Sequence, residues 1–375
     1  MRGPAVHPIV IAAGGTGGHF FPAEALAAEL IARGHRIVLM TDARSGGLKS
    51  PVFAGREQYV IHGAGIAGRG VWRGIKAAGS LAAGVMQARG ILAGLGAGCV
   101  VGFGGYPSVA PVLAARLLPR RRPAVILQEQ NAVLGRANRF LCSRADVLAL
   151  GFDNTTRVPA GTQTMVSGNP VRPAIAALAQ TGYVAATGRI RLLVLGGSLG
   201  ARVFSDVVPA ALAVLPEPIR SRISLVQQVR AEDMQRVTAA YAASGIAAEL
   251  APFFGDVADR LVAAHLVIAR AGASTVAELA VAGRPSILVP LPGAIDDHQS
   301  ANALALQHTG AARVIPQPAF TPDALTALLT ELLADPVGLT GAAVAARTLA
   351  RADAASRLAD LVESQMAALT ADKHA

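Results

Sequence analysis

The sequence predicts an α/β protein with two Rossmann-like, doubly wound domains in tandem. Short apolar runs alternate with longer Ala- and Leu-rich stretches, which is typical of βαβ units around a parallel sheet. A glycine-rich turn follows the first apolar run of each half, and the two turns, at residues 14–18 and 196–200, lie 182 positions apart. A chain of 375 residues suits two domains of ordinary size.

In the first half, residues 7–13 (HPIVIAA) form the first expected strand, because they are apolar and of strand length. The turn GGTGGH then opens a helix over residues 20–33, with Pro22 near its first turn and Gly34 just past its end. Further strands are expected at residues 36–40, 99–101, 125–128 and 147–150.

The pattern restarts after the segment PVRP at residues 170–173. Strands are expected at residues 190–195, 223–227, 266–269 and 286–290, and residues 338–370 are expected to form one long Ala-rich helical stretch. We therefore expect a first domain over residues 1–172 and a second over 173–345. A C-terminal helix within 346–375 is expected to pack back on the first domain.

Composition excludes several classes of protein. Apolar residues make up 52% of the chain and charged residues 15%, which excludes global disorder. Cys99 and Cys142 have no CxxC spacing, which excludes a disulfide scaffold or a cysteine zinc site. The mean hydropathy is +0.45, but the uncharged run at residues 90–115 is rich in glycine and indicates a strand, a turn and a helix. A soluble or peripheral protein is expected.

Charge is unevenly distributed between the halves. Residues 1–172 hold 19 Lys and Arg against 7 Asp and Glu, a net charge of +12, whereas residues 173–375 hold 15 against 17, a net charge of −2. A basic half attracts nucleic acid, anionic lipid or a phosphorylated substrate. Only 4% of residues are aromatic, and no nucleic-acid-binding motif is present, so nucleic acid is disfavoured.

The two glycine-rich turns are candidate phosphate sites. Glycines let the backbone approach a ligand, and the following helix offers free N–H groups and the positive end of its dipole. Neither GGTGGH nor GGSLG is a strict GxGxxG or a Walker loop, so each is also compatible with a plain tight turn. His19 is a candidate base, phosphate partner or helix-start residue, and Ser198 would add a hydroxyl donor to the second turn.

Other polar residues also lie where a nucleotide could bind. Pro170 and Pro173 stiffen the chain around Arg172, which suits a diphosphate, although a surface salt bridge is the alternative. Glu278 follows the turn after a strand and suits the hydroxyls of a ribose, or else is a surface glutamate. The run DDH at residues 296–298 is not expected to bind a metal, because consecutive side chains do not converge easily on one ion.

Three residues follow strands of the first half. Tyr106, Glu129 and Asn131 are expected to point toward the same crevice as Thr16 and His19, because ligands of α/β sheets bind where strands end.

Seven motifs in order resemble the MurG family of UDP-N-acetylglucosamine–N-acetylmuramyl-(pentapeptide) pyrophosphoryl-undecaprenol N-acetylglucosaminyltransferases. They are GGTGGH followed by FP, GGYPS, EQN, NPVR, GGSLGA, RAGASTVAEL and DDHQSANA, and they span about residues 10–310. The resemblance implies the GT-B fold, in which two Rossmann-like domains face a cleft. It implies inverting transfer of GlcNAc from UDP-GlcNAc to the MurNAc 4-hydroxyl of undecaprenyl-diphosphate-MurNAc-pentapeptide (lipid I). The products would be lipid II and UDP, in peptidoglycan synthesis, with no metal or other cofactor.

The resemblance also implies roles for individual residues. Arg172 and Ser198 would meet the donor diphosphate, Phe254 the uracil through its backbone, and Gln299 the GlcNAc hydroxyls. Along the nucleotide would lie Ala273, Ser274, Thr275, Val276, Ala277 and Glu278, with Glu278 on the ribose, and Thr16, Gly17, Gly18 and Asn131 would complete the donor site. Thr16, His19, Tyr106 and Asn131 would bind lipid I. His19 is expected to act as the base or to steer the hydroxyl, and Glu129 is its rival.

Two positions depart from the family pattern. Gln128 stands where the family often has His, and His298 stands where many members have a second Gln. The first departure weakens any role for a histidine at that position. The second leaves the sugar contacts mainly to Gln299.

The acceptor chemistry implies contact with a membrane. Residues expected to face the anionic inner leaflet of the cytoplasmic membrane, from its cytoplasmic side, are Trp72, Arg73, Ile75, Lys76, Arg120, Arg121 and Arg122. An ordinary solvated helix face is the alternative. The expected partners are UDP-GlcNAc, lipid I, the anionic leaflet and other cell-wall synthesis proteins, but not nucleic acid.

Other functions stay open at this point. A UDP-GlcNAc 2-epimerase, or a glycosyltransferase for another acceptor, would share the fold without needing a lipid-facing surface. A non-enzymatic sugar-nucleotide-binding or scaffold subunit would tolerate loss of His19 and Gln299. A dehydrogenase is disfavoured, because two glycine-rich halves lack a strict GxGxxG.

Overall fold

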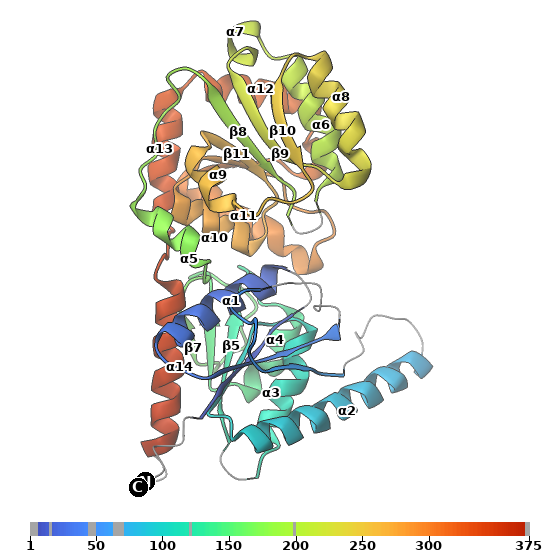
Figure 1. Ribbon diagram of the computed structural model, residues 1–375, viewed down its shortest axis with the longest axis vertical. Helices are drawn as coiled ribbons and strands as arrows, with labels where there is room; N and C mark the ends of the chain where they lie inside the picture. Colours follow the sequence, from blue (N-terminus) through green and yellow to red (C-terminus); the bar gives the residue numbers. More distant parts are fainter. Residues whose placement is uncertain are drawn as a thin grey trace. The chain divides into compact units, whose positions relative to one another are not determined.

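A computed structural model of the protein describes residues 7–14, 17–43, 50–62, 71–119, 122–197 and 200–371. The chain divides into two units, residues 1–172 together with 353–375, and residues 173–352. Figure 1 shows a parallel sheet with flanking helices in each unit. The second unit extends to residue 352. The segment 346–375, which was predicted to hold a C-terminal helix, is therefore divided, with residues 346–352 in the second unit and 353–375 in the first.

The first unit has a seven-stranded parallel sheet in the order β3-β2-β1-β4-β5-β6-β7. This is the doubly wound order, which starts in the middle of the sheet and extends in both directions. The strands are β1 (Ile9–Ala12), β2 (Ile37–Thr41), β3 (Gln58–Val60), β4 (Cys99–Gly102), β5 (Ala124–Glu129), β6 (Val147–Leu150) and β7 (Thr164–Val166). The helices are α1 (Gly17–Ala32), α2 (Val71–Leu95), α3 (Val109–Arg116), α4 (Arg136–Leu141) and α14 (Ala354–Ala371), with 3-10 turns η2 (Tyr106–Ser108) and η3 (Cys142–Arg144).

Successive side chains of the central strands enter two cores on opposite faces of this sheet. Val10 and Val100 pack with α2, α3 and α4, whereas Ile9 and Val101 pack with α1 and α14. Because both faces are covered, every residue of β1, β2, β4 and β5 is buried. Continuous apolar runs in the sequence reflect this double coverage.

The second unit repeats the plan with the order β10-β9-β8-β11-β12-β13, again all parallel. Its strands are β8 (Ile190–Leu195), β9 (Ile223–Gln228), β10 (Ala247–Ala251), β11 (Leu266–Ala269), β12 (Ser286–Leu288) and β13 (Ala312–Val314). Its α-helices are α5 (Pro173–Ala176), α6 (Arg202–Ala213), α7 (Glu217–Arg220), α8 (Met234–Ala243), α9 (Val257–Ala263), α10 (Ala273–Ala282), α11 (His298–Thr309), α12 (Pro322–Leu333) and α13 (Pro336–Arg347). Its 3-10 turns are η4 (Ala177–Gln180), η5 (Ala231–Asp233), η6 (Ile295–Asp297) and η7 (Gln317–Ala319). Leu192 and Val194 of β8 pack with α6, α8 and α12 in one core.

All nine predicted strands are present, with ends that differ by one or two residues at most. Four strands are absent from the prediction, namely β3, β7, β10 and β13, and these are the four edge strands of the two sheets. Each has three to five residues, and the four strands together contain only one buried residue. An edge strand needs fewer apolar residues, so its sequence carries a weaker signal.

The predicted single helical stretch over residues 338–370 is wrong. The segment forms two helices, α13 and α14, which belong to different units. Leu339 of α13 is buried in the core of the second unit, whereas Leu358 of α14 is buried in the first. An Ala-rich sequence permits a helix throughout, but packing against two separate cores requires the chain to break between them.

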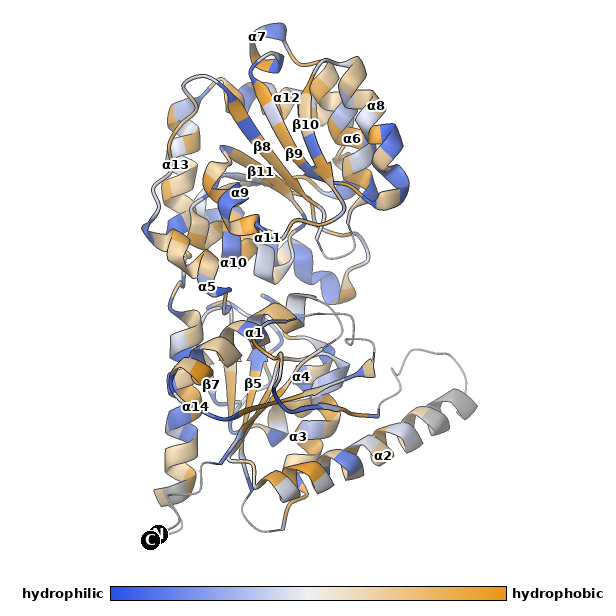
Figure 2. Cartoon of the chain, viewed as in Figure 1, coloured by the Kyte–Doolittle hydropathy of each residue, from blue (hydrophilic) through white to orange (hydrophobic). Residues whose placement is uncertain are grey.

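Hydropathy follows this architecture. In Figure 2 the strands of both sheets are largely coloured as hydrophobic, whereas most helices mix hydrophobic and hydrophilic residues. Across the described residues, no helix by itself has the length and apolar character needed to cross a membrane. Only α12 and α13 taken as a pair reach that composition, and they are bent by 94°.

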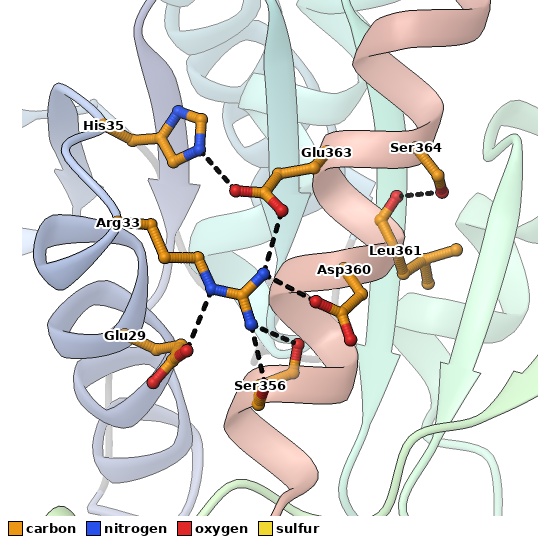
Figure 3. Close-up of polar contacts among 8 residues, drawn as sticks. All are labelled: Glu29, Arg33, His35, Ser356, Asp360, Leu361, Glu363 and Ser364. Carbon is orange, nitrogen blue, oxygen red and sulfur yellow. Dashed lines mark hydrogen bonds and ion pairs between the residues drawn. The ribbon is translucent and has the colours of Figure 1, made fainter.

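A cluster of charged side chains joins α14 to α1 (Figure 3). Nη1 of Arg33, which directly follows α1, donates to Asp360 at 2.6 Å and to Glu363 at 2.8 Å. Nε of the same guanidinium donates to Glu29 of α1 at 2.9 Å. Nε2 of His35 lies 2.7 Å from the other oxygen of Glu363. The cluster supplements the apolar contact between the two helices.

We expect Glu363→Gln to lower the thermal stability of the first unit at neutral pH but not in acid. The hydrogen bond from His35, together with the guanidinium of Arg33, holds the pKa of Glu363 below its ordinary value. A carboxyl whose pKa is lowered by folding adds stability above its unfolded pKa of about 4.3 and loses it as pH falls through the folded value. The effect at pH 7 is about 1 kcal/mol, allowing for screening of a carboxylate that is 37% exposed.

The measurement is the melting temperature of both proteins between neutral and acidic pH. Glu57→Gln is the control, because Glu57 pairs with Arg36 and accepts from Tyr59 at the surface of the same unit, where solvent screening leaves a smaller contribution to stability. If the difference in melting temperature between Glu363→Gln and the native protein were the same in acid as at neutral pH, the charge of the carboxylate would not be what stabilises α14.

Candidate active site

The carboxyl ends of β1, β4 and β5 carry the residues predicted for the first unit. His19 lies in the first turn of α1, after the glycines at positions 17 and 18. Tyr106 begins η2 after β4, and Asn131 follows β5. Neighbouring parallel strands end at the same edge of a sheet, so these residues lie at one edge. Thr16 lies outside the described residues.

The loop after β4 is folded tightly against β1. The hydroxyl of Ser108 is buried and donates to the carbonyl oxygens of Ala12 at 3.0 Å and Gly104 at 2.9 Å. Gly105 has φ 65° and ψ −178°, a conformation that essentially only glycine adopts. A β-carbon at Gly105 would lie 3.3 Å from Cδ2 of His19. The absence of a side chain therefore lets the loop pass directly beside the imidazole ring.

Glu129 is a structural anchor. Its Oε1 accepts from the backbone N–H and the side-chain amide of Asn131, both at 3.0 Å. Its Oε2 accepts from the N–H of Gly135 and the amide of Asn138, both at 2.9 Å. The residue is 2% exposed and its carboxylate already receives four hydrogen bonds, so it is poorly placed to accept a substrate proton. This geometry corrects the expectation that Glu129 rivals His19 as the base.

Arg172 is the last residue of the first unit before the chain enters the second unit, and it lies beside α1. Its guanidinium carbon is 5.1 Å from the ring centroid of Phe21, a cation–π distance. Phe21 is two residues beyond His19 on the same helix. A cation at this place adds to the positive end of the helix dipole, which suits an anionic ligand.

In the second unit, the glycine-rich turn follows β8 and precedes α6. Ser198 lies outside the described residues. Gly200 has φ 68°, and a β-carbon there would lie 2.9 Å from Cγ of Arg230. Close packing against this arginine and a left-handed conformation both require glycine at this end of the turn.

Gln228, at the end of β9, joins two loops with one amide. Its Oε1 accepts from the N–H of Gly196 at 3.0 Å. Its Nε2 donates to the carbonyls of Gly197 and Pro252, both at 3.1 Å. The glycine-rich turn is thereby tied to the loop after β10, which carries Phe254.

Arg260 holds the loop that carries Phe254. Its guanidinium carbon lies 4.1 Å from the ring centroid of Phe254, and Phe254 is almost fully buried. Arg260 also pairs with Glu249 at 2.7 Å and Asp256 at 2.8 Å, and these hydrogen bonds lower the pKa of both carboxyls. Arg260 thereby holds the ring of Phe254 in place in this loop.

The first turn of α10 carries the next predicted residues. Ser274 and Thr275 are half-buried in that turn, and Ala277 and Glu278 are half-buried further along the helix. Val276 is buried in the core, and its N–H donates to the carbonyl of Gly272 at 3.0 Å. The side chain of Val276 therefore supports the helix, and its place along the nucleotide stays a prediction. Ala273 is likewise buried, so only its backbone is available.

Gln299 is oriented by the loop that precedes α11. Its Oε1 accepts from the N–H of Leu291 at 2.9 Å, so its NH2 group points away from that N–H. Arg270 holds the same loop, because its Nη1 donates to the carbonyls of Val289 at 3.1 Å and Pro290 at 3.2 Å. Burial lowers the pKa of Arg270, and Arg230 adds to this, but a guanidinium stays protonated in a protein.

Sequence reasoning missed three side chains that organise these loops, namely Gln130, Gln228 and Arg270. Gln130 follows β5 directly, and its Oε1 lies 2.7 Å from Nδ1 of His19. Each of the three is a polar residue at the end of an apolar strand. A buried polar side chain in that position must bond to neighbouring loops, and this signal was available in the sequence.

The structure describes only part of the predicted membrane-facing set. Arg120 and Arg121 lie outside the described residues. Trp72, Arg73, Ile75 and Lys76 lie at the start of α2, where the described structure does not include their side chains. Arg122 is exposed, and its Nε donates to the carbonyl of Leu118 at 3.2 Å. Within the described ranges, no group of three or more His, Cys, Asp or Glu side chains could hold a metal ion.

Two domain families match separate parts of the chain. The glycosyltransferase family 28 N-terminal domain matches residues 9–149. The glycosyltransferase family 28 C-terminal domain matches residues 191–358. The first match includes β1 to β5 and all but the last residue of β6, and the second includes the sheet of the second unit except Ile190, the first residue of β8.

The chain is similar over nearly its full length to proteins that share one name, "UDP-N-acetylglucosamine--N-acetylmuramyl-(pentapeptide) pyrophosphoryl-undecaprenol N-acetylglucosamine transferase". The protein from Granulibacter bethesdensis is 62% identical over 97% of this chain and 95% of its own length. The protein from Acidiphilium cryptum is 56% identical over 98% of this chain and 99% of its own. The crystal structure of Acinetobacter baumannii MurG has a TM-score of 0.78 and 32% identity, and the match covers 96% of this chain and 99% of that one.

Proposed function

This chain belongs to the MurG family of glycosyltransferases, and from that premise we propose that it transfers GlcNAc from UDP-GlcNAc to the MurNAc 4-hydroxyl of lipid I. Its two Rossmann-like units make up the GT-B fold of that family. The single observation that carries the proposal is the 62% identity to a transferase of that name over 97% of the chain. The products are lipid II and UDP.

We assign UDP-GlcNAc to the loops of the second unit. The turn at residues 196–200 precedes α6, and α10 begins at Ala273, so both places lie near the start of a helix, where free N–H groups favour phosphate and hydroxyl ligands. Glu278 would accept the ribose hydroxyls, and the NH2 group of Gln299 would donate to the sugar. Phe254 would meet the uracil through its backbone, and Ser198 and Arg172 would meet the diphosphate.

We expect Gln228→Met to weaken UDP binding, because it removes three hydrogen bonds that hold two of these loops together. Each such bond contributes about 1 kcal/mol, and part of the loss falls on stability, so a dissociation constant raised about tenfold is expected. Isothermal titration with UDP measures it.

The neighbouring Gln227 provides a matched control. It is on the same strand and fully buried, but it points to the other side of the sheet and bonds to the hydroxyl of Tyr241. Gln227→Met is expected to cost stability while leaving UDP binding within about twofold. Equal weakening of UDP binding by both variants would mean that Gln228 acts on the fold and not on the loops.

We assign the acceptor to the first unit, with His19 as the base. The 4-hydroxyl oxygen of MurNAc bonds to C1 of GlcNAc while the bond from C1 to the diphosphate oxygen breaks on the opposite face, so the configuration inverts. The hydroxyl proton passes to His19, and the electron pair of the broken bond leaves with UDP. Arg172 and the helix N-termini stabilise the charge that develops on the diphosphate.

The test is incubation of the full chain with UDP-GlcNAc and an undecaprenyl-diphosphate-MurNAc-pentapeptide acceptor. UDP release that depends on the acceptor, together with a GlcNAc-bearing lipid product, is expected. Conversion of UDP-GlcNAc to its 2-epimer without acceptor would support the epimerase alternative. Binding of UDP-GlcNAc without turnover would support a non-enzymatic role.

We further propose that the first unit docks on an anionic membrane from its cytoplasmic side. Residues 1–172 carry a net charge of +12. Met86 on α2 is 58% exposed, and Leu117, directly after α3, is 53% exposed. Nε of Arg89 donates to the carbonyl of Leu117 at 3.2 Å. Apolar side chains bordered by cations suit a surface of anionic lipid.

Binding of the full chain to anionic vesicles should fall as salt rises, because the Debye length shortens from about 10 Å at 0.1 M to about 3 Å at 1 M. Apolar residues should leave a salt-resistant remainder. Co-sedimentation with anionic and neutral vesicles across a salt series measures both parts. Equal binding to the two lipids would remove the electrostatic part of the proposal.

A further inference from the structure

Gln130 is a buried amide with contacts at both ends. It follows β5 directly and is only 1% exposed. Its Oε1 lies 2.7 Å from Nδ1 of His19. Its Nε2 lies 3.0 Å from the carbonyl oxygen of Phe103 and 3.1 Å from that of Gln128, and it also contacts Oε1 of Gln128.

These surroundings decide which end of the amide faces which neighbour. The carbonyls of Phe103 and Gln128 accept hydrogen bonds and cannot donate them, so the group beside them must be the NH2. Turning the amide over would place its oxygen against carbonyl oxygens in a buried site, which is unfavourable. The oxygen of Gln130 therefore faces His19.

The same argument extends to the imidazole. An amide oxygen only accepts, so Nδ1 of His19 must carry the hydrogen in the bond to Gln130. In the neutral ring the other nitrogen, Nε2, then holds the free lone pair. A β-carbon at Gly105 would lie 3.4 Å from Nε2, so glycine at that position keeps a side chain away from this edge of the ring.

We infer that Gln130 is a positioning residue that fixes the Nδ1–H tautomer of His19 and so presents Nε2 to the acceptor hydroxyl. The inference rests on the proposed role of His19 in the transfer reaction. Without Gln130 the neutral ring is free to carry its hydrogen on either nitrogen and to turn about its side-chain bonds. A base held in the wrong tautomer cannot take a proton, and in other enzymes such a loss costs up to about 10⁴-fold in kcat.

The direct test is NMR of the full chain labelled with ¹⁵N-histidine, at a pH about two units above the ordinary histidine value of ~6.5. The protonated and unprotonated ring nitrogens have well-separated shifts, and comparison with His19→Ala assigns the signals. We expect the Nδ1–H tautomer in the native protein. A native spectrum with the hydrogen on Nε2 would overturn the inference, and this measurement needs neither turnover nor a Gln130 variant.

Two variants of Gln130 complete the test. Gln130→Met keeps the length of the side chain but offers no acceptor oxygen, so the His19 tautomers should mix and kcat should fall about 10–100-fold, with KM for UDP-GlcNAc within about threefold. Gln130→Glu still offers an oxygen that accepts from Nδ1, so it should keep the Nδ1–H tautomer and more activity than Gln130→Met. Gln227→Met is the control for loss of a buried amide.

The outcomes separate the inference from the proposed function. If the Gln130→Met spectrum retains a pure Nδ1–H tautomer, the inference is wrong whatever the activity. If the tautomers mix in Gln130→Met but kcat does not change, Gln130 fixes the tautomer without acting on catalysis, and the inferred positioning role in the reaction is wrong. If the native protein shows the Nδ1–H tautomer but forms no lipid product, the proposed function fails while the positioning by Gln130 stands.

Discussion

Replacing His19 with alanine is expected to lower kcat about 10²–10⁴-fold, the usual contribution of a general base, while UDP affinity stays within about threefold. His19 lies at the start of α1 in the first unit, and its Nδ1 is engaged by Gln130. The second unit holds the loops assigned to UDP. Loss of the imidazole should therefore affect the acceptor step and not donor binding.

Turnover with saturating UDP-GlcNAc and isothermal titration with UDP separate these two effects. His308→Ala is the control, since His308 is exposed at the end of α11 in the second unit. It should leave both values unchanged. A large loss of UDP affinity in His19→Ala would make His19 a donor ligand and would remove its assignment as base.

Replacing Arg172 with alanine is expected to reduce kcat/KM about 10²–10³-fold, comparable to the loss of one preorganised donor to a developing anion. The guanidinium lies over Phe21 beside the N-terminal turn of α1, where its charge adds to that of the helix dipole. Arg172→Lys should recover only part of the loss, because an ammonium ion lacks the planar fork that binds two phosphate oxygens.

Steady-state kinetics of the alanine and lysine variants test this expectation. Arg56→Ala is the control, because Arg56 is an exposed arginine of the same unit that donates to the carbonyl of Val52 at 3.0 Å. Phe21→Leu should cause a smaller loss than Arg172→Ala if the ring serves to orient the guanidinium. Near-normal kcat/KM in Arg172→Lys would rule out a bidentate contact between Arg172 and the diphosphate.

The central strands were predictable because both of their faces are buried. Such strands must be apolar at every position, as in IVIA of β1 and LVIA of β11, and the signal is continuous along the chain. The four edge strands are half-exposed and short, so their composition does not distinguish them from loops. The break between α13 and α14 has a similar origin. Alanine permits helix on both sides of it, and two separate cores decide where the helix ends.

The candidate site was predictable in its position but not in the roles of its polar residues. The glycine-rich turns and His19 occur where a strand gives way to a helix, a place that the sequence marks locally. Glu129 and Gln130 are adjacent in the sequence, and nothing local indicates that the carboxylate is occupied by Asn131, Gly135 and Asn138 while the amide reaches His19. His19, the partner of Gln130, comes from another element 111 residues away, whereas the partners of Glu129 lie within nine residues of it, in the loop after β5 and on α4.

The sequence by itself determined the two doubly wound sheets, the places of the glycine-rich turns and the family, because these depend on patterns that are continuous along the chain. Only the tertiary structure decided that Glu129 is an anchor, that Gln228 and Arg270 hold the donor loops, and that Gln130 meets His19. A buried polar side chain must satisfy its hydrogen bonds with whatever groups the fold brings within about 3 Å of it. Those groups lie up to 111 residues away in the chain, as between His19 and Gln130, and no local pattern records the distance in space.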